Sequence, residues 1–155
     1  MNILGDELEN KIVLEIGKFT ILWAEFENNY CSNNCDSNKI WKFSLTLSVD
    51  NKILKDFSKE LHGRTEYFNE DIETYTNYNL IPQNAHRPKA KYIKIMRDFI
   101  NLDELVNSYW ICGALLCIYR IRNNLLHGLK ELSELNGQIG LFKSMNKVLE
   151  NIRRK

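Results

Sequence analysis

One uncharged apolar run constrains the fold of this chain more than any other feature. It covers residues 109–119, Tyr-Trp-Ile-Cys-Gly-Ala-Leu-Leu-Cys-Ile-Tyr, and is eleven residues long. In the longer segment from Asp103 to His127, apolar side chains would surround most of a helical circumference, which is typical of a buried helix. A membrane-spanning helix needs roughly 20 apolar residues. We therefore predict that this segment is the central helix of a folded domain and not a membrane anchor.

Apolar residues elsewhere recur at the spacing of amphipathic helices. Residues 6–30 are predicted to form one such helix, with an apolar stripe of Ile12, Ile16, Phe19, Trp23, Phe26 and Tyr30. Asp50 is suited to cap a second helix, and Gly63 is suited to end it. A last helix is predicted from about Gln138, and the basic residues 153–155 are favourable near a helix C-terminus.

Two stretches are less regular. Trp41, Phe43, Leu45 and Leu47 alternate with polar residues, which favours a strand, but the sequence shows no partner strand. We therefore predict helix or irregular structure for residues 37–48. A helix over residues 65–80 is predicted to lead into a loop over residues 82–88, which holds both prolines. The sum is a single domain spanning residues 1–155, an all-α up-and-down bundle of five or six helices.

Charge is balanced over the chain, which has 21 Lys and Arg residues against 20 Asp and Glu residues. No strong overall field would attract nucleic acid, so any anionic partner must be held by a local patch. One stretch from His86 to Arg97 is basic and contains no acid. Its strong bases are Arg87, Lys89, Lys91, Lys94 and Arg97. Two interpretations stay open, a solvated helix face or a patch that positions the phosphates of RNA.

The first residues of the sequence bear on whether the protein is secreted and on whether its cysteines are reduced. Residues 1–6 lack the basic start and apolar run of a secretory signal, so we expect a cytoplasmic protein with reduced thiols. Cys112 and Cys117 lie in the predicted central helix, where they would serve as small apolar residues. A zinc site could in principle be formed by Cys31, Cys35, His62 and His86. The two histidines are far apart in sequence, which argues against this site. We therefore expect no metal or other cofactor.

Polar and ionisable side chains follow directly on the apolar run, namely Arg122, Asn123 and His127. Residues five apart on a helix are rotated by about 140° and separated by about 7.5 Å along the axis. Arg122 and His127 would therefore not stack on one continuous helix, whereas Asn123 and His127, four apart, would share a face. A complete site would need a second copy of the chain related by a two-fold axis.

These residue types suit the cleavage of RNA without a metal ion. Histidine can take a proton from a 2′-hydroxyl or give one to a leaving 5′-oxygen. Arginine can stabilise the negative charge that builds on the phosphate, and Asn123 can hold the imidazole or a phosphate oxygen. A structural role is the other interpretation. A histidine in the last turn of a helix is favoured by the helix dipole, and an arginine can simply pair with a glutamate.

The string Arg122-Asn-Asn-Leu-Leu-His127-Gly128 resembles the signature of the HEPN superfamily (higher eukaryote and prokaryote nucleotide-binding domains). In that signature an arginine and a histidine are separated by four to six residues. The string is most similar to the branch of bacterial proteins called Apea-like HEPN. The segment Trp-Ala-Glu-Phe-Glu at Trp23–Glu27 is also similar to that branch. The resemblance implies a helical-bundle dimer.

For function, the resemblance implies a metal-independent endoribonuclease that leaves 2′,3′-cyclic phosphate and 5′-hydroxyl ends. Arg122 and His127 would be catalytic and Asn123 supporting, in a composite site at a homodimer interface. Such proteins act as toxins, whose partner is an antitoxin, or in antiphage defence. Leu129 stands where members paired with nucleotidyltransferase antitoxins carry a tyrosine, so regulation through such a tyrosine is not expected. Because the superfamily includes non-catalytic members, the alternative is a helical module that binds a nucleotide or a partner protein.

Overall fold

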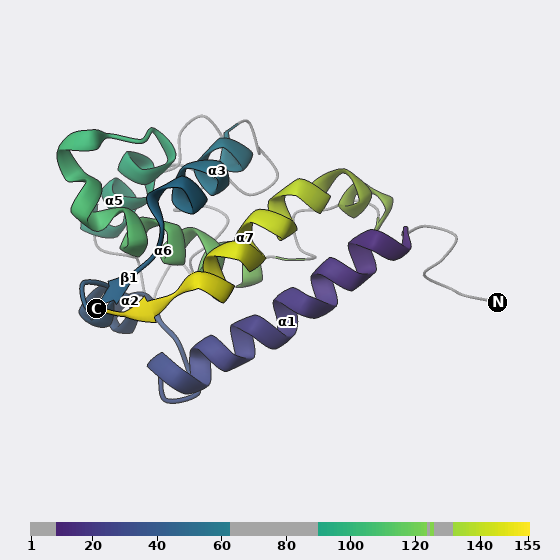
Figure 1. Ribbon diagram of the computed structural model, residues 1–155, viewed down its shortest axis with the longest axis horizontal. Helices are drawn as coiled ribbons and strands as arrows, with labels where there is room; N and C mark the ends of the chain where they lie inside the picture. The colour runs from purple at the N-terminus through teal and green to yellow at the C-terminus, as the bar shows by residue number, and fades with distance from the viewer. Residues whose placement is uncertain (1–8, 63–89, 124, 126–131) are drawn as a thin grey trace.

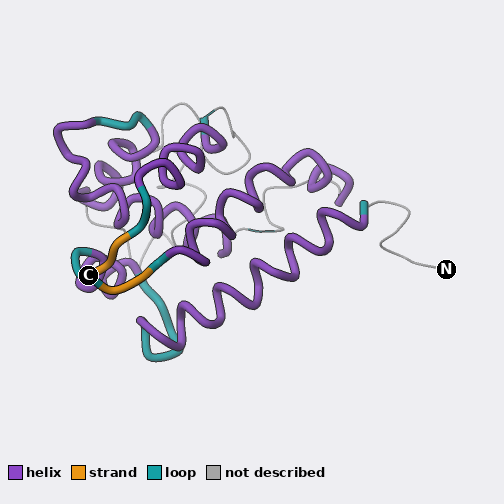
Figure 2. The backbone as a smooth tube through the Cα atoms, viewed as in Figure 1, coloured by secondary structure: helices purple, strands orange, loops and turns teal. Residues whose placement is uncertain are grey.

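The computed structural model describes residues 9–62, 90–123, 125 and 132–155, and in this part of the chain the fold is an all-α bundle (Figure 1). The all-α prediction is confirmed, and Figure 2 shows helix along most of the described backbone. The α-helices are α1 (Asn10–Tyr30), α2 (Ser37–Ser44), α3 (Asn51–Leu61), α5 (Ala90–Ile100), α6 (Trp110–Asn123) and α7 (Ile139–Asn151). Two 3-10 helices, η2 (Glu104–Tyr109) and η3 (Leu132–Gln138), and two short strands, β1 (Leu47–Ser48) and β2 (Arg153–Arg154), complete the described elements.

Helix α6 lies at the centre of the bundle and packs against α2, α3 and α5. Its side chains are buried from Trp110 to Ile118 with little interruption, as the uncharged run predicted. Helices α5 and α6 approach closely at Gly113, where an added Cβ would lie only 2.6 Å from the Cβ of Phe99. Helix α1 lies on the outside of the bundle, and its buried stripe packs against α7 (Figure 1).

Two of the helices begin at aspartate caps. At the start of α3, Asp50 accepts a hydrogen bond from the backbone N–H of Lys52 at 2.8 Å, which confirms the predicted cap. At the start of α2, Asp36 accepts one from the N–H of Lys39 at 2.8 Å. In both places the carboxylate satisfies a backbone donor that the helix itself leaves unpaired.

The small sheet corrects two predictions. Strand β1 pairs antiparallel with β2, with Leu47 opposite Arg154 and Ser48 opposite Arg153. The alternating stretch over residues 37–48 therefore begins as helix α2 but ends in a strand that does have a partner. Helix α7 ends at Asn151, so residues 153–155 do not close a helix. Pairing the two strands satisfies backbone groups of both segments, and residues so far apart in sequence give no local sign of it.

The predicted central helix is shorter than expected. Residues 104–109 form the 3-10 helix η2, α6 begins only at Trp110, and the indole N–H of Trp110 donates to the carbonyl oxygen of Asp103 at 3.1 Å. Helix α6 ends at Asn123, and Leu125 lies in a turn. A single continuous helix from Asp103 to His127 is therefore wrong at both ends. Asparagine favours helix ends and turns because its side chain competes for backbone hydrogen bonds.

Several predictions fall outside the described residues. These are the helix over residues 65–80, the loop over residues 82–88 and the helix stop at Gly63. In the parts of the chain that are described, no helix combines the length and the hydropathy needed to cross a membrane.

Candidate functional site around Arg122

Arg122 lies in the last turn of α6, and 48% of its side chain is exposed. Its Nη1 donates a hydrogen bond to Oδ1 of Asn123 at 3.1 Å. Its Nη2 lies 4.0 Å from Oε1 of Glu27 on α1, a carboxylate that is only 17% exposed. The guanidinium is thus held on one side by an amide and a carboxylate, while half of the side chain still faces solvent. The structure pairs Arg122 with Asn123 and with Glu27, and the predicted role of Asn123 toward His127 or a phosphate stays a prediction.

Glu27 connects three segments of the chain at one point. Its Oε2 accepts the backbone N–H of Cys35 at 3.2 Å, and its backbone oxygen accepts the N–H groups of Cys31 and Asn33 at 3.0 and 2.9 Å. The end of α1, the loop after it and the end of α6 therefore meet at this residue. The sequence signal for Glu27 was its place at the end of the Trp23–Glu27 segment, but that signal did not identify Arg122 as its partner.

Aromatic rings also pack together where α1 meets the end of α6. The ring of Trp23 on α1 lies 6.2 Å from the ring of Tyr119 on α6 and 5.0 Å from that of Phe26. Tyr119 precedes Arg122 by three residues, so both belong to the same end of α6. The end of α6 therefore contacts the Trp23–Glu27 segment of α1 at two places, through Tyr119 and through Arg122.

The loop after α1 contains a disulfide between Cys31 and Cys35, whose Cα atoms are 4.9 Å apart. Both cysteines are buried. The expectation of reduced thiols is wrong for this pair. Ser32 and Asn33 adopt positive φ angles of 52° and 71°, so the chain turns back on itself and brings the two cysteines together. The zinc candidate loses both of its thiolate ligands. Among the described residues, no three His, Cys, Asp or Glu side chains are grouped closely enough to hold a metal ion.

The other arginine of α6 and its two cysteines are buried, in contrast to Arg122. Arg120 is 7% exposed, and burial lowers the pKa of its guanidinium to about 10. Cys112 and Cys117 are free and buried, as expected of small apolar residues in a core. Burial raises the pKa of the Cys117 thiol, so this thiol stays protonated and unreactive. Arg122 is therefore the arginine of this helix that a ligand can reach.

The basic run of residues 86–97 is described only in part. Lys94 is exposed and pairs with Asp98 on the next turn of α5 at 2.6 Å, and Arg97 is half-buried. Arg87 and Lys89 lie outside the described residues, as does the side chain of Lys91. The Lys94 ion pair fits the interpretation as a solvated helix face, and a phosphate patch on α5 stays a prediction.

His127 lies outside the described residues, so its distance from Arg122 also stays a prediction. The rotation of about 140° that was predicted between the Arg122 and His127 side chains no longer applies. It assumed one continuous helix, whereas α6 ends at Asn123 and Leu125 lies in a turn.

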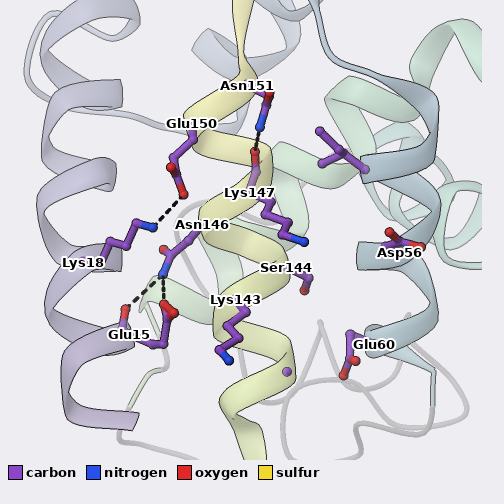
Figure 3. Close-up of a pocket in the computed structure, with 12 residues that line it drawn as sticks. Glu15, Lys18, Asp56, Glu60, Lys143, Ser144, Asn146, Lys147, Glu150 and Asn151 are labelled. Carbon is purple, nitrogen blue, oxygen red and sulfur yellow. Dashed lines mark hydrogen bonds and ion pairs between the residues drawn. The ribbon is translucent and has the colours of Figure 1, made fainter. Parts of the chain in front are cut away.

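A hollow of about 470 Å³ lies elsewhere, between α1, α3 and α7 (Figure 3). Asn146 points from α7 toward α1, where its Nδ2 donates to the backbone oxygen and to Oε2 of Glu15 at 3.1 and 3.0 Å. Lys18 on α1 pairs with Glu150 on α7 at 2.9 Å. The charged residues around this hollow are of both signs. The Lys18–Glu150 ion pair and the hydrogen bonds from Asn146 to Glu15 link α1 to α7. We interpret it as part of the packing between helices.

The candidate site thus consists of Arg122, Asn123 and Glu27 at the junction of α1 and α6. A half-exposed guanidinium presents N–H donors to solvent and can bind a phosphate in a bidentate manner. The HEPN resemblance rests on the residues alone. Comparisons with models of protein families, with curated proteins and with solved structures find no match for this chain.

Proposed function

We propose that this chain is a metal-independent endoribonuclease of the HEPN type, in which Arg122 contacts the scissile phosphate and His127 transfers protons. One observation carries the proposal. The half-exposed guanidinium of Arg122 is held by Asn123 and by Glu27 of the Trp23–Glu27 segment. A guanidinium oriented before substrate binds loses little side-chain freedom when it meets the phosphate. A role as a toxin or in antiphage defence belongs to the same proposal.

The chemistry follows from the residue types. One His127 imidazole takes the proton of the 2′-hydroxyl, and the 2′-oxygen attacks phosphorus. The bond to the 5′-oxygen breaks, and that oxygen takes a proton from the His127 side chain of a second copy, which acts in its protonated imidazolium form. The products are a 2′,3′-cyclic phosphate and a 5′-hydroxyl. The Arg122 guanidinium stabilises the charge that builds on the non-bridging oxygens, and the shared site requires a homodimer.

The test compares wild type, Arg122→Ala and His127→Ala on a mixed RNA in EDTA. Removal of the acid–base group is expected to slow cleavage by about 10²-fold or more, and removal of the guanidinium by a similar factor. Lys52→Ala, on an exposed lysine of α3 that pairs with Asp56, is the control and should cleave normally. Equal cleavage by wild type and His127→Ala would overturn the proposal. A solution mass near the 18.3 kDa of one chain would overturn the shared site.

The second candidate is a HEPN-like module without catalysis that binds a nucleotide or a partner protein. The near-neutral net charge of +1 favours it, because no strong overall field attracts RNA. It predicts that Arg122→Ala leaves any cellular effect of expression intact. Toxicity that disappears in both Arg122→Ala and His127→Ala would exclude this candidate.

A further inference from the structure

A second basic surface lies near the same end of α1, and we call it the C-terminal basic patch. It consists of Arg153, Arg154 and Lys155, all of them exposed. Among the described residues, none of the three side chains forms an ion pair with a carboxylate. Pairing of β2 with β1 places Arg153 opposite Ser48, and the N–H of Lys155 donates to the carbonyl oxygen of Thr46 at 2.9 Å. Arg153 and Arg154 are thus held on an ordered strand, on opposite faces of it, and Lys155 follows directly.

Two aromatic rings lie beside the patch. The guanidinium of Arg154 lies over the ring of Tyr30 at 5.1 Å. Tyr30 in turn stacks on Phe43 of α2, with ring centroids 5.7 Å apart and an angle of 25° between the planes. Both rings are only partly buried. Proteins that bind single-stranded nucleic acid combine these features, because the rings stack on bases while the cations contact phosphates.

The patch and the Arg122 site are connected through α1. Tyr30 follows Glu27 by three residues, so their side chains are neighbours on the helix surface, and Glu27 contacts Arg122. A row of neighbouring side chains therefore leads from the candidate site to the patch. Its members are Arg122, Glu27, Tyr30 and Arg154.

Carboxylates mark one boundary of this surface. Glu25 and Glu150 line a hollow of about 360 Å³ that Tyr30 also lines. Glu150 is neutralised by Lys18, whereas Glu25 repels phosphate. An RNA strand that leaves Arg122 would therefore pass over Tyr30 toward β2 and not into the hollow.

We propose that the C-terminal basic patch binds the backbone of single-stranded RNA and extends the substrate site from Arg122 to β2. The identity of the ligand as RNA rests on the proposed function. A base that stacks on Tyr30 must take the place of Arg154 over the ring and must be unpaired, so a duplex of the same sequence is expected to bind more weakly. An acidic protein segment is the competing occupant, and it would use the cations without the rings.

The test measures binding of a fluorescein-labelled single-stranded RNA by anisotropy at several salt concentrations, with His127→Ala in every variant to prevent cleavage. The patch variant carries Arg153→Gln, Arg154→Gln and Lys155→Gln. The matched control carries Lys11→Gln, Lys52→Gln and Lys55→Gln, and it loses the same three charges from lysines paired on other surfaces. Each lost phosphate contact lowers the slope of log K against log salt by about 0.7 for a single strand. The slope of the patch variant should therefore fall by about 2, and that of the control should stay at the starting value.

Circular dichroism of both variants verifies that they fold. Equal slopes for patch variant and control would overturn the inference, as would tighter binding of a polyglutamate peptide than of RNA. Failure of the inference and failure of the proposed function are distinguishable. Cleavage by wild type together with an unchanged slope refutes the patch alone. A reduced slope together with no cleavage by wild type supports the patch and refutes the ribonuclease.

Discussion

Replacing Gly113 with alanine adds one methyl group where α6 packs closely against α5. The new Cβ would lie 2.6 Å from the Cβ of Phe99 and 2.9 Å from the carbonyl oxygen of Ile95. Neither obstacle can rotate away, so the helices must separate. Overpacking of this kind costs about 3 kcal/mol at the upper end of its usual range, and alanine recovers about 1 kcal/mol through helix propensity. We expect a net loss of about 2 kcal/mol, which lowers Tm by about 4–8 °C in a chain of this size.

Gly17 is the matched control, because it is also helical but an added Cβ there meets nothing within 4 Å. Gly17→Ala is expected to stabilise the fold by about 1 kcal/mol. Urea denaturation followed by circular dichroism gives the free energy of unfolding of both variants, and equal m-values show that they unfold to comparable states. If Gly113→Ala is as stable as wild type while Gly17→Ala is stabilised as expected, α5 moves at no cost and the reasoning is refuted.

Two other variants test the junction of α1 and α6. Glu27→Gln removes the charge beside Arg122 but keeps an oxygen for the N–H of Cys35, so kcat on RNA in EDTA should fall about tenfold with KM and Tm unchanged. An unaltered kcat would exclude a positioning role for this carboxylate. Cys31→Ser combined with Cys35→Ser opens a loop with a sequence separation of 4 and should lower the free energy of unfolding by about 2 kcal/mol. Adding a dithiol reductant to wild type should reproduce that loss, and insensitivity to reductant would count against it.

The apolar spacing predicted the described helices well in their middles and poorly at their ends. The middle of the α1 stripe, from Phe19 to Phe26, and most of the uncharged run are buried as expected, because the burial of one helix face follows a local period. Helix ends depend on more distant partners. Helix α7 ends before Arg153, because Arg153 pairs with Ser48 of β1. The residues around 153 in the sequence do not indicate this pairing.

For the candidate site, the sequence by itself determined that Arg122 and Asn123 stand where a buried helix meets polar residues, and which chemistry these groups can perform. Only the tertiary structure decided that Glu27 is the partner of Arg122, that a disulfide closes the loop behind Glu27, and that Arg154 lies over Tyr30. Periodicity shows which face of a helix is buried, but it does not show what that face meets. Pairings between distant residues are set by how helices pack, and that depends on the whole core at once.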